Sequence, residues 1–269
     1  MQSGLSALSS IDEWLAWQEQ CHVKNIDLGL ERVASVYKAL KPTHSRSIYT
    51  ITVAGTNGKG SCVAMLEAIF IAAGYRVGVY STPHLKHYNE RVRINGTPVL
   101  DSSLASSFYK IDLARKETSL SYFEFGTLAA VDVFDHYKVD IQILEVGLGG
   151  RLDAVNIVDA DAALITSISI DHIDWLGDDR NQIALEKAGV FRANQIAVCG
   201  DSTVPNSLID YAKKLGTQLS LAGKDFDVNK NVNDWSLVAN HVFAGHYPMP
   251  VLQGYHQIKN AAAVVSLLA

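Results

Sequence analysis

The stretch that decides the fold is Ile51-Thr52-Val53-Ala54-Gly55-Thr56-Asn57-Gly58-Lys59-Gly60-Ser61. The apolar, β-branched run from Ile48 to Val53 predicts a buried strand, and the residues from Ser61 to Ala73 predict a helix. A strand, a glycine-rich turn and a helix together form a cradle for phosphate. Glycines allow backbone N–H groups to converge on an anion, and the helix N-terminus adds its positive dipole end.

The chemistry of the turn indicates a nucleotide. Lys59 is placed to reach the β- and γ-phosphates, and the Ser61 hydroxyl is placed to bind Mg²⁺. The spacing departs from the usual G-x-x-x-x-G-K-[ST] pattern, because Gly60 separates Lys59 from Ser61. The alternative interpretation is an ordinary glycine-rich turn between a strand and a helix. We predict a phosphate cradle made of Gly55, Thr56, Asn57, Gly58, Lys59, Gly60 and Ser61.

Composition excludes several classes of protein. The chain has 269 residues and a net charge of −5, so no basic surface indicates a nucleic-acid partner. Its three cysteines are far apart and form neither a disulfide framework nor a zinc pattern, which favours a reducing, cytoplasmic setting. The first ten residues lack a signal-peptide pattern, and no apolar run approaches the ~20 residues that span a membrane.

The order of elements predicts an α/β fold. Strands alternate with helices over about residues 48–220, which is typical of a mostly parallel sheet with helices on both faces. Short segments separated by Asn, Asp and Gly turns predict a small antiparallel sheet over about 218–251. A last helix starts at about 256, and the chain stops at Ala269 inside an apolar run. We therefore expect that a downstream part is missing.

Polar residues follow three of the predicted strands. Thr82, Glu145 and His172 each come after an apolar run, and ligands collect at the carboxyl ends of the strands in open α/β sheets. Hydroxyl, carboxylate and imidazole groups beside a phosphate cradle suit a Mg²⁺–nucleotide site. Thr82 has an ordinary alternative as a turn cap, and His172 has one as a structural residue. The convergence of the cradle, Thr82, Glu145 and His172 on one edge favours the site. Lys187 lies on a predicted helix, where the ordinary alternative is a solvated face.

Two further stretches bear on the ligand. The aromatic run Tyr122-Phe123-Glu124-Phe125 predicts either core packing or a surface for a flat ring. The loop from Gly147 to Ala154 does not fit G-x-G-x-x-G, so the sequence argues against a dinucleotide site.

Taken in order, the motifs resemble a known family. They are Gly55-Thr56-Asn57-Gly58-Lys59-Gly60-Ser61, Ser81-Thr82-Pro83-His84-Leu85, Leu144-Glu145-Val146-Gly147-Leu148-Gly149-Gly150-Arg151-Leu152-Asp153, Asp171-His172 with Asp174-Trp175-Leu176-Gly177, and Glu186-Lys187-Ala188-Gly189. The set resembles the bacterial dihydrofolate synthase / folylpolyglutamate synthase family of the Mur ligase superfamily. The resemblance implies a P-loop-containing α/β domain of an ATP-dependent amide ligase, which joins L-glutamate to dihydropteroate or to the γ-carboxyl of a reduced folate.

The resemblance also implies roles for single residues. Thr56, Asn57, Gly58 and Lys59 would hold the ATP phosphates, and Asn260 would lie near the adenine. Thr82, Glu145 and His172 would hold Mg²⁺, and a carbamylated Lys187 would help to hold a second Mg²⁺. Lys59, His172 and Lys187 are thus the expected catalytic residues. The expected pteroate-binding residues are Asp27, Leu28, Gly29, Ser121, Tyr122, Phe123, Glu124, Leu152, Asp153 and Ala154.

The family has a second, C-terminal domain that this sequence lacks, so residues 1–269 are expected to form the ATP-binding domain and to be inactive alone. We expect a monomer. Three other functions stay open: a nucleotide-binding module without turnover, a Mur-type ligase for cell-wall amino acids, and a small-molecule kinase.

Overall fold

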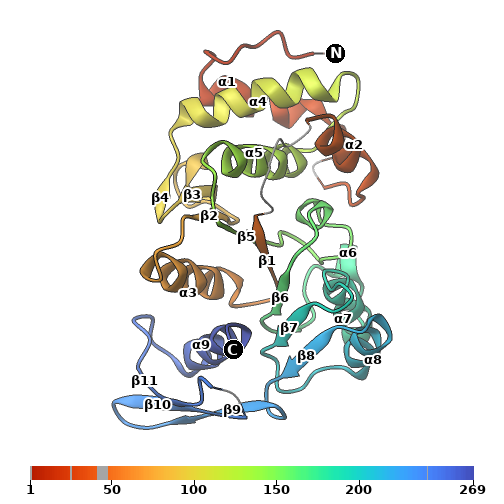
Figure 1. Ribbon diagram of the computed structural model, residues 1–269. Coiled ribbons are helices and arrows are strands. Elements are labelled where there is room, and N and C mark those ends of the chain that lie inside the picture. Colours follow the sequence, from red (N-terminus) through yellow and green to blue (C-terminus); the bar gives the residue numbers. More distant parts are fainter. Residues whose placement is uncertain (1, 25, 41–47, 241) are drawn as a thin grey trace.

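Figure 1 shows the computed structural model, which describes residues 2–24, 26–40, 48–240 and 242–269. Its main sheet contains β1 (Tyr49–Ala54), β2 (Val77–Tyr80), β3 (Val92–Ile94), β4 (Thr97–Pro98), β5 (Ile141–Glu145), β6 (Ala162–Ile165), β7 (Ile196–Cys199) and β8 (Gln218–Leu221). Within the described ranges these eight strands are ordered β4-β3-β2-β5-β1-β6-β7-β8. Neighbours from β2 to β8 run parallel, and β3 and β4 add an antiparallel hairpin at one edge. The mostly parallel sheet predicted from the sequence is confirmed.

The two faces of the sheet bury different side chains, because successive residues of a strand point to opposite faces. Ile51 and Val53 of β1 belong to one apolar cluster, whereas Ala54 belongs to the other. Thr50 shares the face of Ala54, and its hydroxyl accepts a hydrogen bond of 2.8 Å from Gln142 of the adjacent β5. This alternation within a fully buried strand is what lets helices cover both faces.

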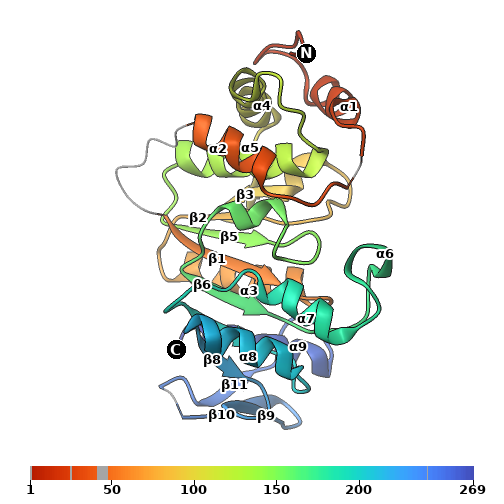
Figure 2. The same cartoon turned by 90° about the vertical axis from the view of Figure 1, so that its right-hand side faces the viewer.

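Helices cover both faces of the sheet (Figures 1 and 2). One apolar cluster joins the sheet to two helices, α3 (Lys59–Ala72) and α9 (Tyr255–Leu267). The other cluster joins the opposite face to the remaining long helices. Those helices are α1 (Ile11–Cys21), α2 (Glu31–Leu40), α4 (Asp101–Arg115), α5 (Tyr122–His136), α7 (Arg180–Ala188) and α8 (Asn206–Leu215). A short helix α6 (Ile173–Leu176) and two 3-10 turns, η1 (Tyr88–Arg91) and η2 (Ala154–Ile157), lie in the connections.

A second, antiparallel sheet consists of β9 (Phe226–Lys230), β10 (Asp234–Ala239) and β11 (Gly245–Pro248) in the order β11-β10-β9. It packs beside α9, and Trp235 stacks on Tyr247 with ring centroids 4.9 Å apart. The small antiparallel sheet predicted from the sequence is confirmed.

The predicted start of this sheet was wrong. Residues 218–221 form β8, which pairs in parallel with β7 and belongs to the main sheet. β8 is an edge strand, and only Leu221 of its four residues is buried. Its sequence therefore lacks the apolar run that marks the inner strands. Among the described residues, no helix is long and apolar enough to cross a membrane.

Candidate nucleotide and substrate site

The predicted phosphate cradle connects β1 to α3 and is anchored by the loop that follows β6. The backbone N–H of Thr56 donates to the carbonyl of Ser167 at 2.8 Å. The carbonyl of Asn57 accepts from the hydroxyl of Thr166 at 2.7 Å and from that of Ser167 at 3.1 Å. The loop is therefore held in shape by the protein itself, as a preformed anion site requires.

Two glycines of the cradle are required by close contacts. Gly55 has φ +142°, and a Cβ there would overlap the hydroxyl of Thr166. Gly58 has φ +92°, and a Cβ there would lie 2.7 Å from Oδ1 of Asn260. Gly60 differs, because apart from its chain neighbours and the backbone of its own helix no described heavy atom lies within 4 Å of its Cβ position. Packing against this chain therefore explains Gly55 and Gly58 but leaves open space beside Gly60.

Lys59 begins α3 and folds its side chain back over the cradle. Its ammonium donates to the carbonyl of Gly55 at 3.1 Å and to that of Thr56 at 3.2 Å. The ammonium thus lies at the N-terminal, positive end of a 14-residue helix. An anion bound there would be stabilised by the charge of Lys59 and by the helix dipole. This is the position that a phosphate-binding lysine needs.

Helix α9 packs across the start of α3. The amide of Asn260 donates to Oε1 of Gln257 at 3.1 Å, and Gln257 donates to the hydroxyl of Ser61 at 3.2 Å. Asn260 and Ser61 were predicted from the sequence, but Gln257 was missed. Its spacing three residues before Asn260 puts both on one helix face and could have indicated it.

Thr82 and Glu145 meet because their strands, β2 and β5, are adjacent. The backbone N–H of Thr82 donates to Oε2 of Glu145 at 3.2 Å. Glu145 is only 4% exposed, and burial raises the pKa of its carboxyl. No Lys, Arg or His of the described residues forms an ion pair with it. A buried carboxylate that forms no ion pair fits a divalent cation.

The other two predicted metal ligands are less closely assembled. His172 lies just before α6 with φ +52°, and its side chain is 54% exposed and 3.7 Å from Asp171. Lys187 is buried on α7, and burial together with the Lys59 charge lowers the pKa of its amine to about 8. Across the described ranges, no three His, Cys, Asp or Glu side chains cluster as a metal site would. The predicted set contains only Glu145 and His172 from these types.

A cavity of about 360 Å³ opens beside Thr82 and collects the predicted substrate residues. Every predicted pteroate-binding residue except Tyr122 lines it. Its lining residues are Ile26, Asp27, Leu28, Gly29, Thr82, Arg91, Ser121, Phe123, Glu124, Gly147, Leu148, Leu152, Asp153, Ala154 and His172. They come from connections that are far apart in the sequence, so this cavity exists only in the folded chain.

One wall of the cavity is tied together by an ionic cluster. The carboxylate of Asp27 lies 2.7 Å from Arg32 and 3.1 Å from His22. Hydrogen bonds from Lys24 and His22 lower the pKa of that carboxyl. Arg32 also lies 3.2 Å from the buried carboxylate of Glu124, which accepts at 2.7 Å from Ser121 N–H in a capping box. Arg32 was missed by the sequence analysis, although it joins the loop 26–29 to the start of α5.

Asp153 is buried in the loop that follows β5, which forms another part of the cavity wall, and its hydrogen bonds hold this loop in shape. Its carboxylate accepts from the N–H groups of Leu148 at 2.8 Å and Val155 at 3.0 Å. Burial raises the pKa of this carboxyl to about 6. Gly147 is required here, since a Cβ there would lie 2.8 Å from the ring of Phe123. Within the aromatic run, Phe125 is fully buried in the core, whereas Phe123 lines the cavity.

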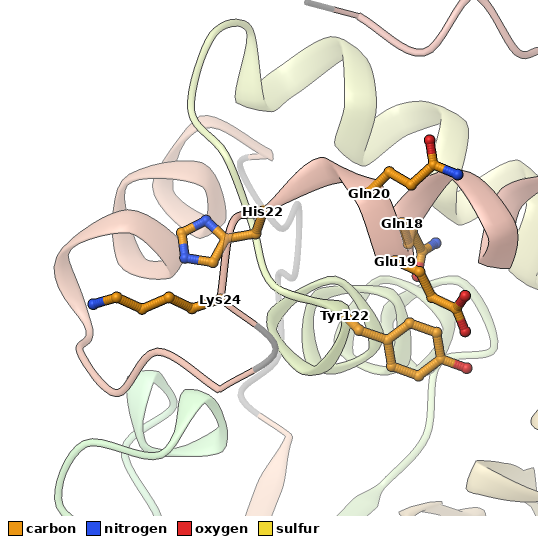
Figure 3. Close-up of a pocket in the computed structure, with 6 residues that line it drawn as sticks. All are labelled: Gln18, Glu19, Gln20, His22, Lys24 and Tyr122. Carbon is orange, nitrogen blue, oxygen red and sulfur yellow. The ribbon is translucent and has the colours of Figure 1, made fainter.

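A larger hollow of about 640 Å³ lies beside α1 and is lined by Gln18, Glu19, Gln20, His22, Lys24 and Tyr122 (Figure 3). It holds none of the predicted phosphate or metal residues. Tyr122, predicted to bind substrate, lines this hollow rather than the cavity beside Thr82. The chemistry therefore concentrates at the smaller cavity, which adjoins the predicted metal ligands.

The chain is similar in sequence to a known family of proteins. Residues 53–268 match the family described as "Mur ligase middle domain". Dihydrofolate synthase/folylpolyglutamate synthase of Escherichia coli (strain K12) is 46% identical over 266 residues, which is 98% of this chain and 61% of that protein. The protein of the same description from Haemophilus influenzae is 51% identical over 231 residues, which is 86% of this chain and 52% of that protein. The chain thus spans between half and two thirds of the length of these relatives.

Solved structures agree in fold. E. coli FolC in complex with DHPP and ADP matches with a TM-score of 0.92 at 44% identity, covering 98% of this chain and 63% of that one. A bifunctional folylpolyglutamate synthase/dihydrofolate synthase with Mn, AMPPNP and L-glutamate bound matches with a TM-score of 0.86 at 46% identity, again covering 98% and 63%.

Proposed function

This chain belongs to the Mur ligase family, and on that premise we propose that it is the ATP-binding part of an amide ligase. The reaction joins L-glutamate to dihydropteroate, or to the γ-carboxyl of a reduced folate, at the expense of ATP. The support from relatives is that FolC binds DHPP and ADP, and that a related synthase binds Mn, AMPPNP and L-glutamate.

One observation carries the proposal: the phosphate cradle and the substrate cavity adjoin. Glu145 pairs in register with Val53, two residues before Gly55 of the cradle. Thr82 contacts Glu145 and also lines the cavity. A substrate in the cavity and a nucleotide in the cradle would therefore meet at these two residues, as a transfer between them requires.

The proposed chemistry has two steps. An oxygen of the substrate carboxylate attacks the γ-phosphorus of ATP, the bond to the β-phosphate oxygen breaks, and an acyl phosphate and ADP form. The amine of glutamate then attacks the acyl carbon, loses a proton, and expels phosphate as the amide forms. Lys59 neutralises charge on the transferred group, and the cradle positions it.

Mg²⁺ fits the buried carboxylate of Glu145, which forms no ion pair with a side chain of the described residues. We propose that Thr82, Glu145 and His172 hold one ion, that Ser61 contributes on the nucleotide side, and that Lys187 contributes to a second ion. Bound Mg²⁺ would offset the negative charge of the phosphates. For Lys187 the proposal is a carbamate, formed when the neutral amine adds CO₂ and releases a proton. A pKa of about 8 supplies a neutral fraction near physiological pH, which supports this modification.

The remaining parts of the proposal concern the whole protein. We propose that it acts in the cytoplasm as a monomer, that Asn260 lies near the adenine, and that a second domain completes the ATP and glutamate sites. Glutamate-dependent phosphate release by residues 1–269 alone would refute the need for that domain.

The test of the function supplies ATP, Mg²⁺, dihydropteroate and L-glutamate to the complete enzyme and measures ADP and amide. Amide formation that depends on both organic substrates supports the proposal. A stable phosphorylated product would indicate a kinase, and activity with cell-wall precursors only would indicate another Mur-type ligase. ATP binding without turnover would indicate a nucleotide-binding module. Lys59→Ala should abolish most of the ADP release, and unchanged release would refute the cradle assignment.

A further inference from the structure

We propose that Arg91 is the receptor for the carboxylate of the acceptor substrate. The inference rests on the proposed function, because it takes the cavity beside Thr82 as the site of a carboxylic acid. It adds a specificity-determining residue that neither the sequence motifs nor the ligand assignments above contain.

The charges of the cavity wall single out Arg91. Three carboxylates line the cavity, on Asp27, Glu124 and Asp153. Each already accepts hydrogen bonds from this chain, and each would repel an anionic end of a ligand. Among the described lining residues, Arg91 is the only Lys or Arg. An acid that enters the cavity therefore has one fixed cation to approach.

The hydrogen bonds of Arg91 leave it free to pair with an anion. Its Nε donates to Nδ1 of His84 at 2.8 Å, and one Nη donates to the hydroxyl of Thr82 at 3.0 Å. Both acceptors are uncharged in this arrangement, since an accepting Nδ1 carries no proton. Arg91 forms no ion pair with a carboxylate of the described residues. A guanidinium has five N–H donors in a planar fork, so donors remain for a carboxylate.

The other arginines near the site are already paired. Arg32 lies 2.7 Å from the carboxylate of Asp27, and Arg93 lies 2.8 Å from that of Glu67. Arg91 thus differs from these two arginines, because its guanidinium is held in place by uncharged groups and not by a carboxylate. This is the expected state of a receptor whose anionic partner arrives with the ligand.

Aromatic rings keep the guanidinium in place. Its central carbon lies 5.4 Å from the ring centroid of Tyr88 and 5.7 Å from that of Tyr122. The two rings themselves meet edge to face at 5.5 Å. Cation–π contacts and the two hydrogen bonds fix the plane of the group before ligand binds, which lowers the entropy lost on binding. Tyr122 therefore does not line the cavity, but its ring helps to hold Arg91, which does.

The position of Arg91 identifies which end of the substrate it holds. Arg91 donates to Thr82, and Thr82 donates to Glu145. Glu145 in turn lies beside the strand that leads into the cradle. A carboxylate on Arg91 would therefore lie on the side of the cavity nearest the phosphates. We infer that Arg91 holds the carboxylate that becomes phosphorylated.

The test compares two ligands on four proteins by isothermal titration calorimetry of the complete enzyme with ADP and Mg²⁺. The ligands are dihydropteroate and its carboxamide, which differ only in the charged group. The wild type should bind the acid about 30-fold more tightly than the amide, as expected for a charge-assisted pair. Arg91→Met should abolish that preference while leaving amide binding unchanged. Arg91→Lys, which keeps the charge but loses the fork, should retain part of the preference.

A matched control removes the same charge elsewhere. Arg76 lies before β2, at the opposite end of that strand, and donates to the carbonyl of Tyr137. Arg76→Met should keep the full preference for the acid. If Arg91→Met keeps it too, or the wild type binds both ligands with no preference, the proposal is wrong although the enzyme still binds dihydropteroate. If the wild type binds neither ligand, the proposed function fails and this inference with it.

Folding is checked by thermal melts of all four proteins. Should Arg91→Met fail to fold, Arg91→Lys decides the matter. If Arg91→Lys melts like the wild type and its preference for the acid over the amide is several-fold lower, the result supports Arg91 as the receptor. An unchanged preference overturns the proposal.

Discussion

Replacing Gly55 by alanine should destabilise the fold far more than replacing Gly60, although both glycines belong to one loop. A Cβ on Gly55 would overlap the hydroxyl of Thr166 and lie 3.0 Å from its backbone nitrogen. The φ of +142° also lies in a region that side chains rarely adopt. The backbone of Thr166 cannot give way easily, because its N–H donates to the carbonyl of Ala54 at 2.9 Å. Both the loop and its anchor would have to move.

The magnitude follows from three contributions. The strained backbone costs about 1–3 kcal/mol, overpacking costs about 1–3 kcal/mol, and the loss of the Thr166 to Asn57 hydrogen bond costs about 1 kcal/mol. Gly55→Ala should therefore lower the free energy of unfolding by at least about 3 kcal/mol. The assay is urea denaturation followed by tryptophan fluorescence and by circular dichroism.

Gly60→Ala is the control. It adds the same methyl group in open space near the start of α3, so the free energy of unfolding should stay the same or rise by up to about 1 kcal/mol through helix propensity. The same variant should weaken ATP binding if phosphates occupy that space. A loss below about 1 kcal/mol for Gly55→Ala, or equal losses for both variants, would refute the packing argument.

Three further predictions concern charged groups. In carbonate-free buffer the contribution of Lys187 to the free energy of unfolding should rise by about 2–3 kcal/mol from pH 8 to pH 10.5, because the unfolded chain holds a proton on Lys187 that the folded chain releases at a pKa of about 8. In urea titrations the stability of the wild type relative to Lys187→Met should therefore increase by that amount over this pH range. The carboxyl of Asp153 should titrate near pH 6 by ¹³C NMR, and stability relative to Asp153→Asn should fall as the pH rises from 3.8 to about 6, because the unfolded chain ionises first. Arg32→Met should cost about 3 kcal/mol by leaving the buried Glu124 without its cationic partner and removing one of the cations that contact Asp27, and it should speed hydrogen exchange in residues 26–29; unchanged exchange would contradict its role.

Local patterns predicted the elements that carry the most chemistry. The apolar run before Gly55 became β1, and the residues after it became α3. Apolar runs that end in polar residues marked the carboxyl edge, where Thr82 and Glu145 meet. Prediction succeeded there because a buried parallel strand needs an apolar run and a phosphate turn needs glycine, and both requirements are visible within ten residues.

The misses share a physical cause. The residues of β8 read as part of the antiparallel sheet, because an edge strand is only partly buried and its pattern resembles a hairpin strand. No local pattern singled out Arg32 or Arg91. Their roles depend on partners such as Glu124, 92 residues away from Arg32 in the chain. Periodicity carries no information about contacts at such separations.

The sequence by itself determined the local conformations: a strand, a glycine turn and a helix at the cradle, and apolar strands between helices that predict a sheet covered on both faces. Only the tertiary structure decided which side chains meet. Thr82 contacts Glu145 across 63 residues because β2 and β5 are neighbours in the sheet. Arg91 faces the cavity without a carboxylate because the surrounding acids are held by other groups. Strand order and ion pairing are settled by packing and by competition among charges in the whole chain, so no local stretch can specify them.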